Sequence, residues 1–280
     1  MRSGRSLSVP SSTGARLGMA LFLVIAALIS YFSLSQYNEV TGETQRISLS
    51  PQQEIALGLQ AAPEMIAQHG GEHPNAEAQA TVDRIGMRIV AQSAAKNSPY
   101  EYEFHLLADD QTINAFALPG GQVFITQALL NRLETEGQLA GVLGHEIGHV
   151  VGRHSAEHIA KAQLTEGLTG AAVLATYDPD NPNSQGGAQI ALLIGKLVNM
   201  RFGRNDELES DALGVRFLAE SGYDPRAMIR VMEILAEASE GQAKPPEFFN
   251  THPNPQNRIA RIETAIKRAF PNGVPEGLIK

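Results

Sequence analysis

The chain has 280 residues, of which 43% are apolar and 19% are charged, a composition typical of a folded globular protein rather than a disordered one. Its formal net charge of −8 argues against nucleic-acid binding, which needs a cationic surface. Because it contains no cysteine, a disulfide scaffold, a thiolate metal site, a cysteine nucleophile and a lipid-modified cysteine are all excluded.

The first 34 residues have the layout of a membrane-targeting segment. Residues 1–16 carry three arginines and no acidic residue, and we interpret them as a cytoplasmic tail. Residues 17–34 contain no charged side chain, and as a helix they would span ~27 Å, close to the thickness of a bilayer core. Basic residues before this stretch and acidic residues after it favour an inner-membrane anchor with the rest of the chain in the periplasm. A cleaved signal peptide and a buried core helix remain as alternatives.

Residues 35–50 are polar and predict a linker, after which residues 51–280 predict one domain. Its apolar periodicity predicts two helices, from Pro51 to about His69 and over 76–95. Alternation of aromatic or aliphatic with polar residues predicts a strand over 100–107. Two further short strands are expected within 115–126, on either side of the turn signal Pro119-Gly120-Gly121.

The remainder of the chain predicts helices almost throughout. Their expected ranges are 127–135, 136–160, 188–201, 206–221, 225–239 and 255–269. A polar loop over 177–187, rich in Pro, Gly and Asn and without an apolar stripe, is the expected moving part near the site. The predicted fold class is therefore α+β and mainly helical, with a small antiparallel sheet packed on the helical body.

The strongest chemical signal is the pentad His145-Glu146-Ile147-Gly148-His149. Residues four apart share one face of a helix, so both imidazoles can reach one metal ion. Glu146, next to the first histidine, lies where it can accept a proton from a water molecule at that ion. The run before the motif, residues 139–144, is apolar and small, which predicts a buried helix rather than one with surface histidines.

A third metal ligand has to come from downstream. The extended motif with a histidine at position 155 is absent, since that residue is Ser155, and this excludes the metzincin pattern. Glu207 and Asp211 are four apart on one expected helix face, whereas Glu209 points elsewhere. Glu207 can complete a His-His-Glu zinc site, and Asp211 can bind the outer nitrogen of a histidine ligand. The alternative is an acidic, solvated helix start.

Four motifs occur along the chain: Asn114 to Gly121, HEIGHVVGRH from His145, ELESDALG from Glu207, and Thr251-His252-Pro253 together with Arg258-Ile259. Together they resemble the zinc metallopeptidase family of CAAX prenyl proteases and heat-shock HtpX-type membrane proteases, over roughly residues 50–270. The resemblance implies a gluzincin fold with zinc on His145, His149 and Glu207 and with Glu146 as the general base. This chain has Ser210 where family members often have alanine, a small change that leaves the ligand in place.

The resemblance also places the segment around His252 over the active site. Two active roles are open for His252: a fourth zinc ligand that keeps the enzyme latent, or a donor to the oxyanion, for which Arg204 is a weaker candidate. A loop histidine without a role is the alternative. Family likeness further implies that an extended substrate pairs with the strand at Gln122, Val123 and Phe124, near Asn114; an ordinary hairpin is the alternative. His154 and His158 are expected to have structural or surface roles, since most histidines are not ligands.

The function predicted from the sequence is a zinc-dependent endopeptidase that cleaves envelope or membrane-associated proteins in protein quality control. Its expected cofactor is Zn²⁺, its partners are a protein or peptide substrate and the membrane, and no nucleic acid is expected. One alternative is a non-proteolytic, zinc-stabilised binding or chaperone-like module of envelope assembly. Another is a hydrolase of small amides. The presence of Glu146 weighs against a purely structural metal site, which has no use for a base.

Overall fold

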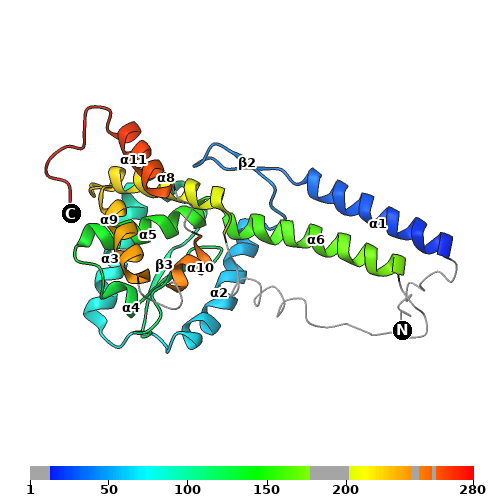
Figure 1. The fold of residues 1–280 in the computed structure, drawn as a ribbon, viewed down its shortest axis with the longest axis horizontal. Helices are drawn as coiled ribbons and strands as arrows, with labels where there is room; N and C mark the ends of the chain where they lie inside the picture. The colour runs from blue at the N-terminus through cyan, green and yellow to red at the C-terminus, as the bar shows by residue number, and fades with distance from the viewer. Residues whose placement is uncertain (1–12, 177–201, 241–245, 254–256) are drawn as a thin grey trace.

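The structure, a computed structural model, describes residues 13–176, 202–240, 246–253 and 257–280. It has a mainly helical body from which two long helices extend side by side, α1 (Thr13–Ser33) and α6 (His154–Thr176) (Figure 1). We call this pair the α1/α6 arm. The predicted helix 188–201 and the predicted loop 177–187 lie outside the described residues. The mainly helical α+β class predicted from the sequence is confirmed.

The arm and the body are joined by a short antiparallel ladder of β1 (Gln36–Tyr37) and β2 (Thr44–Gln45). These strands lie within the predicted linker, yet the segment is fixed to the body by buried side chains. Asn38 donates to the carbonyl of Val151, and Gln45 donates to that of Gly152. We call residues 36–45 the β1/β2 hairpin.

Local sequence signals explain where the next helices begin. Helix α2 (Pro51–Gln68) starts with a capping box in which Ser50 and Gln53 bond each other's backbone N–H groups. Helix α3 (Ala76–Gln92) starts at Asn75, whose side chain accepts from two backbone N–H groups. A short 3₁₀ helix, η1 (Ala94–Asn97), follows it. Both α helices agree with the predicted ranges.

The main sheet has three strands in the order β3–β5–β4: β3 (Glu103–Leu107), β4 (Ala115–Ala117) and β5 (Gln122–Thr126). β4 and β5 form the predicted hairpin, whose turn contains Gly120 and Gly121 with φ of 85° and 110°, conformations that favour glycine. The expectation of a wholly antiparallel sheet is wrong, because β3 pairs with β5 in parallel. After β3, the chain crosses to the opposite edge of the sheet, where it forms β4. It then returns through the hairpin as β5, which lies between the two and runs parallel to β3.

In the C-terminal half, the described residues form mainly helices, with bounds that correct several predictions. The single helix expected over 136–160 is two helices, α5 (Glu136–Val151) and α6, because the chain breaks at Gly152 and Arg153. Helix α10 (Glu247–Thr251) was not predicted. The other helices are α4 (Gln127–Leu130), α8 (Arg204–Ser221), α9 (Ala227–Ser239) and α11 (Arg258–Ala269).

Helices α5 and α8 pack closely, and their contact positions the site. At Gly148, a Cβ would lie 2.6 Å from Oγ of Ser210, so glycine is needed for the two backbones to come this near. Ser210 in turn donates a hydrogen bond from its hydroxyl to the carbonyl of His145. The serine that departs from the family pattern thus ties α8 directly to the helix that carries the pentad.

The α1/α6 arm differs from the body in its surface. Helix α1 is long and apolar enough over Gly14–Ser33 to cross a membrane, by length and composition. Large apolar side chains along it are exposed, among them Leu21, Phe22, Ile29 and Phe32. One side of the helix contacts α6, where a Cβ at Gly167 would lie 3.1 Å from that of Ala27.

Candidate active site

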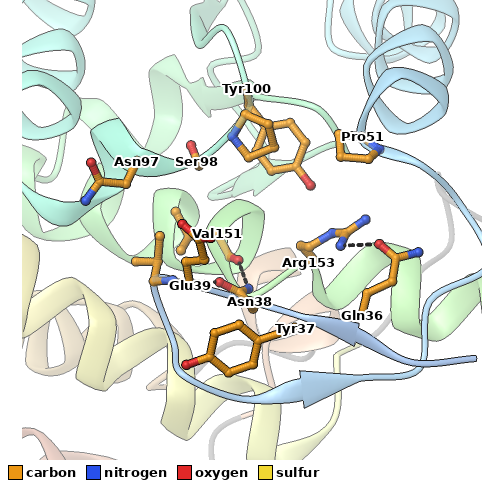
Figure 2. A pocket seen from close by; sticks show the side chains of 12 residues that line it. Gln36, Tyr37, Asn38, Glu39, Pro51, Asn97, Ser98, Tyr100, Val151 and Arg153 are labelled. Carbon is orange, nitrogen blue, oxygen red and sulfur yellow. Dashed lines mark hydrogen bonds between the residues drawn. The ribbon is translucent and has the colours of Figure 1, made fainter.

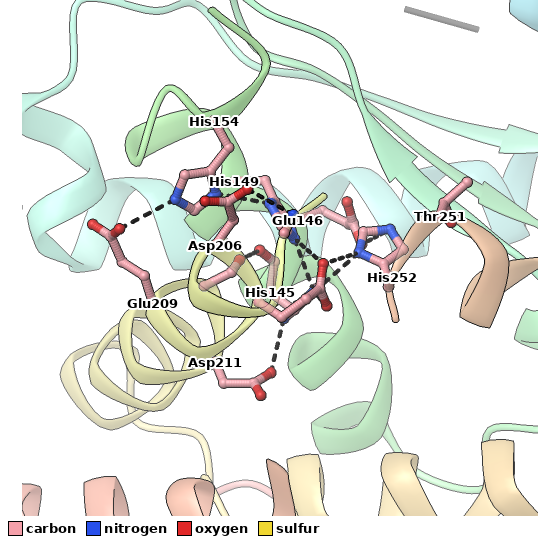
Figure 3. Close-up of polar contacts among 12 residues, drawn as sticks. His145, Glu146, His149, His154, Asp206, Glu209, Asp211, Thr251 and His252 are labelled. Atoms are coloured by element: carbon pink, nitrogen blue, oxygen red, sulfur yellow. Dashed lines mark hydrogen bonds and ion pairs between the residues drawn. The ribbon is translucent and has the colours of Figure 1, made fainter. Parts of the chain in front are cut away.

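Four buried side chains converge at one point between α5, α8 and α10 (Figure 3). His145, His149, Glu207 and His252 each present one nitrogen or oxygen atom, and these atoms lie within 4.8 Å of one another. The Nε2 atoms of His145 and His149 are 3.1 Å apart. The Glu207 carboxylate lies 3.4 Å from Nε2 of His149 and 3.5 Å from that of His145. The structure therefore brings together the three ligands predicted from the sequence and His252, the predicted fourth ligand or oxyanion donor.

The carboxylate predicted to orient a histidine is in place on the His145 side. Oδ1 of Asp211 lies 3.0 Å from Nδ1 of His145, and both Asp211 oxygens accept from buried Arg258 at 2.7 and 2.8 Å. Arg258 also approaches Glu207 at 2.9 Å. Burial opposes ionisation of Asp211, but the charge of Arg258 and the hydrogen bonds to His145 and Arg258 together outweigh it and lower the pKa of that carboxyl. One arginine therefore fixes two carboxylates of the site.

The ionisation states of Glu207 and His149 favour a bound cation. Burial opposes ionisation of Glu207, but the surrounding histidines outweigh it and hold its pKa well below the usual range. Burial holds the pKa of His149 well below its usual value, so that ring is neutral. Burial alone would lower the pKa of His145, but hydrogen bonding to Asp211 and Glu207 raises that pKa to about 9. A metal ion at its Nε2 therefore has to displace a proton.

Glu146 lies beside the cluster and is fully buried. Among the described residues, neither of its carboxylate oxygens has a hydrogen-bond partner, which is unusual for a buried carboxyl. The approach of His252 Nε2 to Oε1, at 3.6 Å, is an ion-pair distance only. Burial raises the pKa of Glu146, so this group readily takes up a proton.

His252 reaches the site from the end of α10 and is fully buried. Its Nδ1 lies 3.1 Å from Glu207 and 3.4 Å from Nε2 of His145. Its Nε2 lies 3.3 Å from the carbonyl oxygen of Ala115, in β4. The ring of Phe248 stacks on it at a centroid distance of 4.5 Å. His252 therefore contacts the ligand cluster and an edge of the sheet at once.

The donor set fits zinc. Imidazole nitrogens and one carboxylate are typical zinc ligands, and four of them around one point suit its tetrahedral preference. Carboxylate and imidazole groups buried this deeply are costly unless a charge compensates them, and the unpaired oxygens of Glu146 add to that cost.

The family model named Peptidase family M48 matches residues 76–266, a range that contains every residue of the cluster. This chain belongs to peptidase family M48. The match confirms the family resemblance drawn from the sequence motifs and the prediction of a zinc metalloendopeptidase fold with zinc as its cofactor.

Curated relatives of the family agree. The chain is 35% identical over 200 residues to the beta-barrel assembly-enhancing protease of Escherichia coli (strain K12). The matched region covers 68% of this chain and 39% of the relative. It is 31% identical over 253 residues to the mitochondrial metalloendopeptidase OMA1 of Schizosaccharomyces pombe, covering 88% of this chain and 71% of the relative. The match to the OMA1 of Bos taurus is 34% over 170 residues and covers 59% of this chain and 32% of the relative. The chain thus spans about two fifths of the length of the bacterial relatives that it matches.

The prediction that a substrate strand pairs at Gln122, Val123 and Phe124 is wrong for this M48 chain. These residues form β5, the middle strand, whose backbone is paired with β3 on one side and β4 on the other. Val123 and Phe124 are fully buried, and the Gln122 side chain binds His105. The sheet edge nearest the cluster is β4 instead. Asn114 precedes β4 and lies 3.4 Å from Thr251, beside His252.

The sequence predicts structural or surface roles for His154 and His158, and the two differ in their distance from the cluster. His158 bonds Asp206 at 2.7 Å and has no contact with the cluster among the described residues, as expected. His154 is buried against the ring of His149, with 2.8 Å between their Nδ1 atoms. Helical periodicity does not predict this contact, because in one continuous helix the two rings would point apart.

Proposed function

We propose that this chain is a zinc-dependent endopeptidase in which Glu146 is the general base. One observation carries the proposal: a buried carboxylate without a hydrogen bond lies beside three histidines and a glutamate that converge on one point. In this proposal, the metal ligands are His145, His149 and Glu207. When bound, zinc lowers the pKa of a water molecule towards ~7 and polarises the scissile carbonyl.

The protein groups supply the proton transfers. Glu146 takes a proton from the attacking water and later delivers it to the leaving amine. Its burial raises its pKa, which favours uptake of the proton. Asp211 and Arg258 hold His145 and Glu207 in fixed orientations throughout, since all four groups are buried and bonded to one another.

We assign substrate binding to the edge strand β4. The register places Asn114 and Phe116 toward β5, so the backbone groups of Ala115 and Ala117 face the other way, toward the site. An extended peptide that adds to this edge would form backbone hydrogen bonds and lie beside Glu146, with little dependence on its sequence. The carbonyl of Ala115 is the contact point of His252.

This geometry favours the latent role of His252 over the role of oxyanion donor. Its Nδ1 faces the same point as the metal ligands, and its Nε2 faces the carbonyl at the substrate edge. In this position His252 competes with both the attacking water and the substrate. If α10 moved away from the sheet edge, the position of the attacking water and the substrate-binding edge of β4 would become accessible at the same time.

The location and substrates that we propose rest on the N-terminal helix and the relatives. An apolar helix over Gly14–Ser33 supports an anchor in a bacterial inner membrane, with the chain before it in the cytoplasm and the peptidase domain 51–280 in the periplasm. A relative named for beta-barrel assembly supports envelope proteins as substrates and a role in protein quality control. A non-proteolytic module of envelope assembly would not require the buried, unpaired Glu146.

The experiment compares casein cleavage by the full-length chain with that of Glu146→Gln, with zinc content measured in both. We expect the variant to keep its zinc, because Glu146 is no ligand, and to lose turnover by about 10³-fold or more. Cleavage at the wild-type rate by Glu146→Gln would refute the assigned base. Zinc in both proteins with cleavage in neither would favour the non-proteolytic alternative.

A further inference from the structure

The two histidines of the pentad have different partners at their outer nitrogens. His145 faces the carboxylate of Asp211, which Arg258 holds in place. His149 faces a second imidazole, that of His154, at 2.8 Å between the Nδ1 atoms. Nε2 of His154 lies 3.3 Å from the carboxylate of Glu209 (Figure 3). We propose that His154, held by Glu209, is a positioning residue that fixes the ring of His149 for metal binding.

The directions of the hydrogen bonds that link His149, His154 and Glu209 follow from one requirement. If Nε2 of His149 gives its lone pair to a metal, its proton is on Nδ1, and that N–H donates toward His154. Nδ1 of His154 must then accept, which puts the His154 proton on Nε2. That N–H donates to Glu209, a carboxylate that only accepts. Every group in the series has a partner, so the arrangement selects one tautomer and one orientation of His149.

The contact depends on the break between α5 and α6. In one continuous helix, residues five apart point about 140° away from each other, so His154 would face away from His149. Arg153 adopts a left-handed conformation with φ of 54°, which turns the chain and brings the two rings together. Gly152 makes room for the turn, because a Cβ there would lie 2.6 Å from Nε2 of His154.

Buried polar contacts hold Arg153 in this unfavourable conformation. Its guanidinium forms an ion pair with Glu54, which is itself bonded to the hydroxyl of Tyr100 at 3.0 Å. It also donates to Gln36 at 2.8 Å (Figure 2). A further hydrogen bond runs from the guanidinium to the carbonyl of Leu49 at 3.2 Å. A non-glycine residue in the left-handed region costs roughly 1–2 kcal/mol, an amount that an ion pair and several buried hydrogen bonds can offset.

The ring of Phe202 completes the enclosure of the two histidines. It stacks on His149 at a centroid distance of 3.9 Å and meets His154 edge-on at 6.2 Å. His149 is therefore confined by packing on its face and by hydrogen bonding at its outer nitrogen. His158, one turn further along α6, meets the same phenylalanine but bonds Asp206 and touches neither ring nitrogen of His149.

The inference rests on the proposed zinc site, and its test separates the two. Zinc affinity is measured by competition with a chromophoric chelator for the full-length wild type, His154→Phe and His154→Gln. His158→Phe is the matched control on the same helix. We expect His154→Phe to bind zinc about 10–100-fold more weakly, as changes to the partners of metal-bound histidines commonly do. His154→Gln should restore most of the affinity, since its amide accepts from His149 and donates to Glu209.

The absorption spectrum of the cobalt-substituted proteins gives a second readout. A change in the orientation of His149 should alter the visible cobalt bands of His154→Phe, while those of His158→Phe match the wild type. If His154→Phe does not fold, Glu209→Leu decides, because Glu209 is partly exposed and its loss should weaken zinc binding in the same direction.

Wild-type zinc affinity and cobalt bands in the foldable variants would overturn the positioning role and leave the proposed function intact. Equal weakening by His154→Phe and His158→Phe would also overturn it, since that indicates a general effect on α6. A wild-type chain that binds no zinc would instead contradict the proposed function itself.

Discussion

The body and the α1/α6 arm arrange polar and apolar groups in opposite ways. Between α5 and α8, carboxylates, imidazoles and a guanidinium are buried and face one another. Along α1, large apolar side chains face outward. Buried charges that converge on a point are what cation binding requires, and exposed apolar helices are what contact with lipid requires. The two regions thus suit different surroundings, a cation in one case and an apolar environment in the other, and the β1/β2 hairpin joins them through Arg153.

The largest effect that this comparison predicts is on the buried charges of the body. Replacement of Arg258 by methionine should leave the carboxylates of Asp211 and Glu207 buried without their shared cation. We expect a loss of about 3–5 kcal/mol in the free energy of unfolding, measured in denaturant on the metal-loaded protein. Arg261→Met, at an exposed position on the same helix, should change it by less than about 0.5 kcal/mol. Similar values for the two variants would contradict the structural role of Arg258.

The second prediction separates the effect of α1 on solubility from the effect of the hairpin on stability. A variant that lacks residues 1–35 should remain in solution without detergent and keep its zinc, because it loses α1 but none of the cluster. A variant that lacks residues 1–45 also loses the buried bonds of Gln36, Asn38 and Gln45 to the body. We expect it to be soluble but about 2–3 kcal/mol less stable, at about 1 kcal/mol for each bond.

Equal thermal stability of the two shortened variants would show that the hairpin adds nothing to the body. Detergent dependence of the variant that lacks residues 1–35 would show that apolar surface outside α1 also meets the membrane.

The third prediction concerns the contact of His252 with both the cluster and the substrate edge. In the latent role, His252→Ala should raise basal casein cleavage by about tenfold if the closed state is about ten times more populated than the open one. As an oxyanion donor, its loss should lower turnover by about 10²-fold with zinc retained. Unchanged cleavage and unchanged zinc affinity would exclude both roles.

The smallest predicted effect lies on the surface of the body, away from the site. Burial opposes ionisation of Asp109, but bonds from Thr112, His69 and Gln111 outweigh it and lower its pKa to about 2. The stability that this provides is present above the unfolded pKa of ~3.9 and is lost as pH falls toward about 2. After allowance for solvent screening we expect about 1 kcal/mol, seen as a smaller acid sensitivity of Asp109→Asn. Identical unfolding profiles of variant and wild type between pH 5 and 2 would contradict the assignment.

Local periodicity was sufficient to predict the central site. His145 and His149 are four residues apart on an apolar helix, and Glu207 and Asp211 are four apart on a later one. This spacing predicts which side chains share a helix face without any knowledge of the fold. The phase also placed Glu209 away from the cluster, where it contacts His154 instead.

The errors arose where tertiary contacts decide the conformation. Arg153 lies in a run with ordinary helical propensity, and its left-handed turn exists because Glu54, far along the chain, pairs with it. Without that break, the sequence predicted one helix over 136–160 and missed the contact of His154. The pairing of β5 on both edges depended on strand order, which alternation alone does not specify, and this moved the substrate edge to β4.

The most direct test of the account is the zinc content of three purified proteins: the wild type, Glu207→Ala and Glu209→Ala. Because Glu207 faces the cluster and Glu209 reaches it only through His154, we expect one zinc per chain in the wild type and in Glu209→Ala, and almost none in Glu207→Ala. A stoichiometric zinc ion in Glu207→Ala, or its loss from Glu209→Ala alone, would contradict the site described here.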